Sequence, residues 1–465
     1  MNQKLSHILV LAALFALLVS DLILAAEVGT LDQASPAQSA PAVADSNYRG
    51  WKSLRLRNDF VDLHAVPEIG GRVIQFRLGD KEFFWVNPQL AGKLPPPSGL
   101  APDGGWLNYG GDKLWPAPQG WDDDSQWPGP PDAVLDGQPY HVERLEQGTA
   151  VRLTSRDDPR SGIRLARVIR LAGDSARVHI RTTMTNVDDK PRRWGIWAHT
   201  QLDGGTAAGA APNPLLNAWC PLNPASHFPK GYRVIFGAAD HPSFQPDASR
   251  GLMRVNYQYR VGKIGLDSTA GWVATVDGAR GAVFVQRFRF EPEKQYPDGS
   301  SVEFWLNGVG TIRAYGKDLV LPDDAVENPY VFESEVLSPF ARLAPGESYT
   351  WDYEWLAANI GGDYPVLDCS PAGITCEPLR AVIVDGTLQL AGRFGVFSPG
   401  RVGLRVLDGR GVCLRELAVA DAVSPLAPLV LEFTAPIPAA AVAVELVLQR
   451  ADGRPVGQLA RADLK

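Results

Sequence analysis

The sequence predicts a nearly all-β chain with two parts, a large β-sandwich or barrel followed by a small β-sandwich. Short runs of alternating apolar and polar residues recur along the chain, and this period of two is typical of half-buried strands. Turn residues separate the runs, and the 465-residue chain has 46 Gly and 38 Pro. The hydrophobic content of 45% is ordinary for a protein with a real core.

The N-terminal residues 1–26 have the pattern of a secretory signal peptide. A weakly basic start precedes the apolar run 9–19, and Ala25-Ala26 offers a small-residue cleavage site. An uncleaved membrane anchor is the alternative, but Asp21 would then lie within the span. We therefore expect a periplasmic or secreted protein without a membrane span after signal cleavage.

The segment 27–47 is rich in Ala, Ser, Pro, Gln and Asp and has no apolar period, which predicts a disordered leader. The formal net charge is -7. A mildly acidic chain argues against nucleic acid and against anionic membranes as partners.

Roughly 440 residues remain after the signal, too many for one average domain. Strand-like runs begin at 54–58 and recur as far as 349–355, which predicts a first domain over 48–358. A Gly-rich linker follows. Short strand-like runs then predict a C-terminal β-sandwich over 366–465, close in size to an immunoglobulin-like domain.

The chain has 4 Cys, too few for a disulfide scaffold and without zinc-type pairing. Cys369 and Cys376 bracket a short loop, so they either form a local disulfide in an oxidising compartment or remain free thiols. The acidic run 122–124 is interpreted as a solvated loop, because a calcium site needs six or more oxygens from several directions. We expect no metal and no cofactor.

A loop rich in tryptophan carries the first candidate site. Two glycines precede Asp112 and Lys113 and let the backbone approach a ligand closely. Aromatic rings beside charged groups suit a sugar, whose C–H faces stack on rings while its hydroxyls form hydrogen bonds. Tyr109 and Trp115 are further candidates for ligand binding, although the tryptophans alternatively cover the sheet.

Three later segments carry further candidates. Trp197 and His199 share one face of a predicted strand, and a histidine titrates near neutral pH, as a general acid requires. Glu333 and Glu335 also share a strand face, where like charges raise a pKa. Lys263 lies between two glycines and is placed to reach into a site. The alternatives are a satisfied core histidine, a solvated strand face and a surface lysine.

The order of these segments resembles the galactose mutarotase-like superfamily and, within it, the domain of unknown function 4380 family. The resemblance covers roughly 48–357. It rests on Gly110-Gly111-Asp112-Lys113 with Trp115-Pro116, on Asn186 and Asp189-Lys190-Pro191 ahead of His199-Thr200, and on Glu333-Ser334-Glu335-Val336 with Ser338-Pro339. It implies that the first domain is a galactose mutarotase-like β-supersandwich.

The resemblance also implies a sugar ligand and a reaction like that of aldose 1-epimerase. His199 would protonate the ring oxygen while Glu333 or Glu335 takes the proton of the anomeric hydroxyl. Asp112, Lys113 and Lys263 would hold sugar hydroxyls, and Trp115 or Trp197 would stack on the ring. Position 109 is Tyr where the hexose-phosphate relatives carry Arg. A non-catalytic glycan-binding protein and a structural role for both domains are the alternatives.

Overall fold

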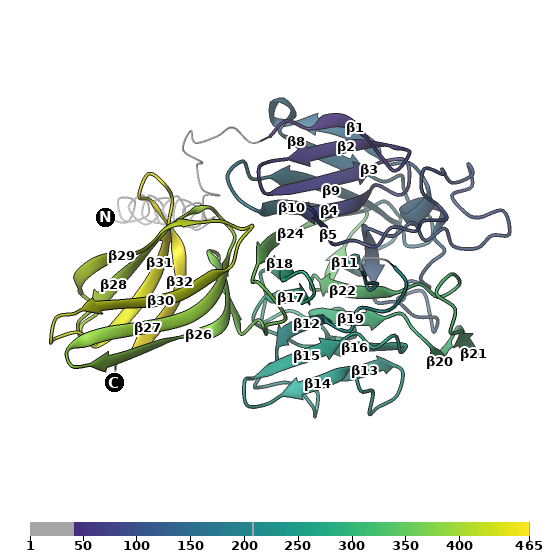
Figure 1. Cartoon of the computed structure of the whole chain (residues 1–465). Coiled ribbons are helices and arrows are strands. Elements are labelled where there is room, and N and C mark those ends of the chain that lie inside the picture. Colours follow the sequence, from purple (N-terminus) through teal and green to yellow (C-terminus); the bar gives the residue numbers. More distant parts are fainter. Residues whose placement is uncertain (1–40, 207–208, 465) are drawn as a thin grey trace, which may run out of the picture. The chain divides into compact units, whose positions relative to one another are not determined.

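The structure, a computed structural model, describes residues 41–206 and 209–464. The predicted signal peptide and most of the predicted leader lie outside these residues. The described chain is nearly all β, as predicted (Figure 1). Its helical elements are three short turns, the π-helical η1 (Ala133–Gly137) and the 3-10 turns η2 (Glu146–Gly148) and η3 (Pro297–Gly299).

A 12-stranded antiparallel sheet carries the candidate site residues. Its strands follow the order β1-β2-β3-β4-β6-β11-β22-β19-β16-β13, with β5 paired to β4 and β23 paired to β11. Their bounds are β1 (Ala44–Tyr48), β2 (Trp51–Arg57), β3 (Val61–Val66), β4 (Arg72–Leu78), β5 (Lys81–Glu82), β6 (Asp112–Ala117), β11 (Arg192–Asp203), β13 (Arg233–Phe236), β16 (Gly262–Leu266), β19 (Val302–Leu306), β22 (Val331–Leu337) and β23 (Ala341–Leu343).

A 10-stranded antiparallel sheet packs against the first one, in the order β14-β15-β12-β17-β18-β24-β10-β9-β8-β7. Its strands are β7 (His141–Leu145), β8 (Ala150–Thr154), β9 (Ile163–Leu171), β10 (Arg177–Asn186), β12 (Leu216–Pro221), β14 (Phe244–Asp247), β15 (Leu252–Asn256), β17 (Trp272–Asp277), β18 (Ala282–Phe288) and β24 (Ser348–Asn359). A separate hairpin consists of β20 (Gly310–Ala314) and β21 (Lys317–Leu321).

The C-terminal strands form two four-stranded sheets, β25-β26-β27-β30 and β29-β28-β31-β32. Their bounds are β25 (Asp368–Cys369), β26 (Gly373–Val384), β27 (Thr387–Val396), β28 (Gly400–Leu407), β29 (Cys413–Val423), β30 (Leu429–Pro436), β31 (Ala443–Gln449) and β32 (Pro455–Asp463). The predicted small sandwich is therefore present. Cys369 and Cys376 are buried free thiols in this structure.

One expectation about the N-terminus was wrong. Residues 44–47, assigned to the disordered leader, belong to β1, which pairs with β2 from Ala44↔Arg55 to Tyr48↔Trp51. The strand lies at the edge of the sheet and its side chains are mostly exposed, so its polar composition gave no apolar period. Its ladder of backbone hydrogen bonds needs no particular side chains.

The two large sheets enclose one apolar core. Aromatic rings pack across the interface between them. The ring centroid of Phe284 on β18 lies 5.8 Å from that of Phe76 on β4 and 5.9 Å from that of Trp355 on β24. Outer strands alternate as the sequence predicts, and in β9 every second residue from Ile163 to Leu171 is buried. The central strands β6 and β22 are buried on both faces, so each can present polar groups on one face and still contribute to the core on the other.

A polar network crosses this core between the sheets. Arg167 on β9 is paired with Asp112 on β6 at 2.5 Å, and both side chains are fully buried. Thr200 on β11 donates to the other oxygen of Asp112 at 2.8 Å. Gln286 on β18 donates to Thr200 and accepts from Ser334 on β22 at 2.7 Å. The network therefore ties β6, β11 and β22 to the second sheet in a fixed register.

Replacing Asp112 by Asn should destabilise the protein by ~3–5 kcal/mol, because the guanidinium of Arg167 would stay buried without a counter-charge. Urea unfolding followed by fluorescence measures the change. The control is Asp352→Asn, which breaks the exposed 2.8 Å pair with Arg181 and should cost less than about 1 kcal/mol. Equal effects of the two substitutions would contradict a structural role for the buried pair.

Candidate functional site

The face of the 12-stranded sheet opposite this network carries two rows of polar and aromatic side chains. In the first row, Lys113, His199, Glu335 and Glu303 lie directly opposite one another on β6, β11, β22 and β19. In the second row, Gln201, Glu333, Trp305 and Lys263 lie opposite one another on β11, β22, β19 and β16. Residues opposite one another share a sheet face, so strand register assembles these two rows.

A cavity of about 1030 Å³ opens over this face. Tryptophans and side-chain amides make up about a third of its lining, alongside many aliphatic residues and prolines. Six tryptophans contribute, namely Trp85, Trp106, Trp115, Trp121, Trp197 and Trp305. Seven amides contribute, namely Asn87, Gln89, Asn108, Gln119, Gln201, Asn307 and Asn328. Aromatic faces and amides together suit a ligand that has both C–H surfaces and hydroxyl groups.

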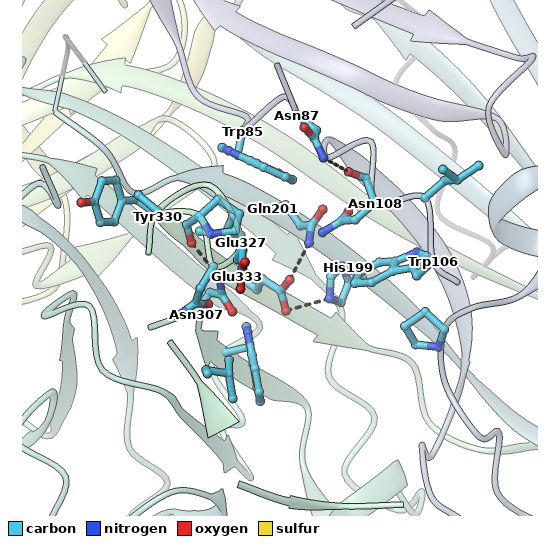
Figure 2. A pocket seen from close by; sticks show the side chains of 18 of the residues that line it. Trp85, Asn87, Trp106, Asn108, His199, Gln201, Asn307, Glu327, Tyr330 and Glu333 are labelled. Atoms are coloured by element: carbon cyan, nitrogen blue, oxygen red, sulfur yellow. Dashed lines mark hydrogen bonds and ion pairs between the residues drawn. The ribbon is translucent and has the colours of Figure 1, made fainter. Parts of the chain in front are cut away.

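A hydrogen-bonded pair of titratable groups lies in the cavity wall. The Nε2 atom of His199 is 2.9 Å from Oε2 of Glu333, and Gln201 donates to the other carboxylate oxygen at 2.7 Å. Figure 2 shows the Glu333 carboxylate between these two side chains. Both members of the pair line the cavity, yet both are largely buried.

Burial disfavours the charged form of each group. It lowers the pKa of His199 well below its usual 6.5, and the positive charge of Lys113 lowers it further. Burial raises the pKa of Glu333 above its usual 4.5, although Lys113 acts in the opposite direction. These opposite shifts bring the two pKa values closer together, so the two groups share a proton readily. Such pairs are typical of acid–base sites.

Glu335 has a different environment from Glu333. Its Oε2 accepts hydrogen bonds from Trp197 at 2.8 Å and from Lys263 at 2.9 Å. Lys263 also pairs with Glu303 at 2.8 Å. Burial alone would lower the pKa of Lys263, but the two carboxylates raise it above its usual value. Glu335 is fully buried and does not line the cavity. Its location suits a role in orienting the side chains of Trp197 and Lys263.

The structure brings together five of the nine candidate site residues at the cavity: Trp115, Trp197, His199, Lys263 and Glu333. Three others are placed differently from the expectation. Asp112 is on the opposite face, paired with Arg167. Tyr109 packs against Trp51 in a separate apolar cluster. Lys113 is buried, with its ammonium over the rings of Trp106 and Trp115.

The alternation of side chains along a strand explains the correction for Asp112. Asp112 and Lys113 are neighbours on β6, so their side chains must point to opposite faces, and only Lys113 is on the site face. Gln201, which the sequence analysis missed, shares a strand face with Trp197 and His199 and was detectable by the period of two. Trp85, Asn108 and Trp305 come from separate segments, and no local pattern marks them.

Several buried polar atoms of the cavity lining have no hydrogen-bond partner among the described residues. They are Nδ1 of His199, Oε1 of Gln201 and Nε1 of Trp115. Buried polar groups are nearly always satisfied by protein or by ordered water, so these three atoms are free to form hydrogen bonds with whatever occupies the cavity.

Metal binding is a second chemistry that the donor set allows. His199, Glu333 and Glu335 each offer a donor atom, and these atoms lie within 4.8 Å of one another. The ammonium of Lys263 already pairs with the Glu335 carboxylate, and Gln201 donates to Glu333. A divalent cation would have to displace a buried ammonium, so the arrangement fits a proton-sharing pair better.

Comparison with known proteins agrees with the resemblance seen in the motifs. Residues 51–209 match the family model of a domain of unknown function, DUF4380. The match includes the Trp-rich loop, β6 and β11, and therefore His199. Within the described residues, no helix has the length and apolar character needed to cross a membrane.

Solved structures show similarity at low sequence identity. A galactose mutarotase-like protein from Lactobacillus casei has a TM-score of 0.41 and 10% identity, covering 66% of this chain and 99% of that one. A galactose mutarotase related enzyme from Lactobacillus acidophilus has a TM-score of 0.40 and 11% identity, covering 65% and 96%. A TPR-domain containing protein from Parabacteroides distasonis has a TM-score of 0.42 and 14% identity. The match covers 68% of this chain but only 48% of that protein, about half its length.

Lys113 should make the stability depend on pH. Burial and the nearby Arg72 lower its pKa from 10.5 to about 7. The cost of burying the ammonium is therefore fully present below about pH 7 and disappears as the pH rises towards 10.5. Relative to the wild type, Lys113→Met should therefore raise the free energy of unfolding more at pH 6 than at pH 10. The difference between the two effects should be on the order of 4 kcal/mol.

Chemical unfolding of wild type and variant at the two pH values measures this difference. Lys52→Met is the control, because Lys52 is exposed on β2 and its replacement should have the same small effect at both pH values. A pH-independent effect of Lys113→Met would contradict the lowered pKa.

Proposed function

We propose that the chain binds a carbohydrate in the cavity and interconverts its anomers in the manner of an aldose 1-epimerase. One observation carries the proposal: the buried, hydrogen-bonded pair His199–Glu333 in the wall of a cavity lined with tryptophans and amides. The superfamily resemblance of the motifs and the DUF4380 match are consistent with it but do not assign a reaction.

The reaction needs one proton acceptor and one proton donor beside the anomeric carbon. The acceptor takes the proton of the anomeric hydroxyl, the bond from the anomeric carbon to the ring oxygen breaks, and the donor protonates the ring oxygen. The open aldehyde turns about its first carbon–carbon bond and recloses with the proton transfers reversed. Atoms and charge balance without a cofactor.

The geometry of the pair suits this double transfer. The anomeric and ring oxygens are bonded to one carbon, so they lie side by side, as do His199 Nε2 and Glu333 Oε2 at 2.9 Å. With one proton between them, one member donates and the other accepts. Glu333 is the carboxylate in question, because Glu335 is held by Trp197 and Lys263 and does not line the cavity.

Glycan binding without catalysis is the second candidate function. The cavity volume of about 1030 Å³ favours it, because this is at the upper end of what a drug-sized ligand needs and exceeds the size of one sugar. A binding protein would use the same tryptophans and amides and would not require the His199–Glu333 proton.

His199→Asn and Glu333→Gln should each reduce the rate of anomer interconversion by about 10²–10⁴-fold, the usual contribution of a general acid or base. Proton NMR exchange or polarimetry with a panel of aldoses measures the rate. Glu143→Gln, an exposed substitution on β7, should leave it unchanged. Glu335→Gln should have a smaller effect than Glu333→Gln.

Three outcomes are informative. Loss of turnover with retained sugar binding in His199→Asn supports the acid–base assignment. Turnover that survives both substitutions contradicts it. Sugar binding by the wild type without any acceleration assigns the glycan-binding function instead.

We further propose that the chain is exported, on the basis of the residues 1–26. When the full chain is expressed in a Gram-negative host, the mature protein should be recovered from the periplasm or the medium with Glu27 as its first residue. N-terminal sequencing checks this. Retention of the intact N-terminus in the cytoplasm would overturn the proposal.

A further inference from the structure

The aromatic residues of the cavity differ sharply in exposure. Trp115 and Trp197 are each 2% exposed, and their rings lie 4.2 and 5.5 Å from the ring of His199. Trp121 and Tyr315 also line the cavity, but they are 37% and 45% exposed. The buried pair therefore marks the floor beside His199–Glu333, and the exposed pair marks the opening.

The two exposed aromatics meet across the opening. Trp121 follows β6, and Tyr315 forms the turn between β20 and β21. Their ring centroids are 4.6 Å apart, and the Tyr315 hydroxyl donates to the carbonyl of Pro130 at 3.0 Å. The β20–β21 hairpin belongs to neither large sheet. It therefore presents an aromatic side chain to the Trp-rich loop from outside the core.

Tyr315 has an unfavourable backbone conformation for its residue type. Its φ is 53°, in the left-handed region that bulky side chains rarely adopt. Tyr315 and Gly316, whose φ is 72°, form the two-residue turn of the hairpin, and this type of turn requires a positive φ at both positions. The ring is 45% exposed, and its contacts are with the Trp121 ring and the Pro130 carbonyl rather than with the core. An exposed aromatic ring that lines the opening of a cavity is available for contact with a ligand.

The charges of the lining restrict the ligand. The basic side chains are Arg49, paired with Glu82 at 2.8 Å, and Lys263, paired with two buried carboxylates. Three acidic residues also line the cavity: Asp203, Glu327 and Glu333. Within the described part of the lining, every lysine or arginine already has a carboxylate partner. A phosphate or carboxylate on the ligand would therefore meet net negative charge.

We propose that the ligand is a neutral oligosaccharide, with its reducing end at His199–Glu333 and a more distal sugar unit stacked on Trp121 and Tyr315. This rests on the proposed carbohydrate function and names its substrate class. The cavity volume of about 1030 Å³, the two separated aromatic pairs and the absence of an unpaired cation in the described lining all support a neutral chain over a monosaccharide or a sugar phosphate.

Binding by the full-length mature chain tests the inference. Isothermal titration calorimetry would compare neutral sugars of one to four units, from glucose, galactose, mannose and xylose series, with glucose 6-phosphate and oligogalacturonate. The dissociation constant for at least one neutral series should fall by about tenfold or more between one and four units, as expected for one added stacking site. The anionic sugars should bind more weakly than neutral sugars of equal length.

Substitutions at the opening locate the distal unit. Trp121→Ala and Tyr315→Asn should each weaken the four-unit sugar by about 3–10-fold and leave the monosaccharide within about twofold. Asn tolerates positive φ, so it removes the ring without straining the turn further. Tyr315→Phe keeps the ring and should bind like the wild type. Val430→Ser, an exposed position on β30 outside the cavity lining, is the control.

The outcomes separate this inference from the proposed function. Equal affinity for one and four units, tighter binding of anionic sugars, or no effect of Trp121→Ala and Tyr315→Asn would overturn the inference even if mutarotation depends on His199. Length-dependent binding without mutarotation would support it and overturn the catalytic proposal. A protein that binds none of these sugars would contradict both.

Discussion

The alternation of side chains along β6, β11 and β22 is the constraint on which the site depends. One face of these strands carries Asp112, Thr200 and Ser334, which connect to the second sheet through Arg167 and Gln286. The other face carries the cavity and its titratable pair. A slip of one residue in register would exchange the two faces, so the buried network that fixes the register also fixes the site.

Burial gives the pair its chemical character. In water, a glutamate side chain is fully ionised at most pH values, whereas a histidine side chain changes from protonated to neutral near pH 6.5. In the cavity wall, the loss of hydration lowers the pKa of His199 and raises that of Glu333. The ammonium groups of Lys113 and Lys263 lie over the rings of Trp115 and Trp197, so they add positive charge next to the pair.

Much of this was predictable from the sequence. Period-two alternation and turn residues predicted the all-β fold, and the same alternation placed Trp197 with His199 and Glu333 with Glu335. The alternation did not predict the role of a residue where that role depends on its tertiary partners. The position of Arg167 shows that Asp112 belongs to the core, and the partners Trp197 and Lys263 distinguish Glu335 from Glu333. The polar β1 and the lining from remote segments, such as Trp305, have no local pattern that reveals them.

Nitrogen-15 NMR of the histidine imidazoles, titrated over pH with and without bound sugar, tests the central claim most directly. That claim is that His199 shares one proton with Glu333 at the wall of a ligand cavity. The account predicts that His199 titrates well below pH 6.5, that Glu333→Gln changes its resonance, and that sugar binding perturbs it. A His199 that titrates near pH 6.5, insensitive to both Glu333→Gln and sugar, would contradict the account.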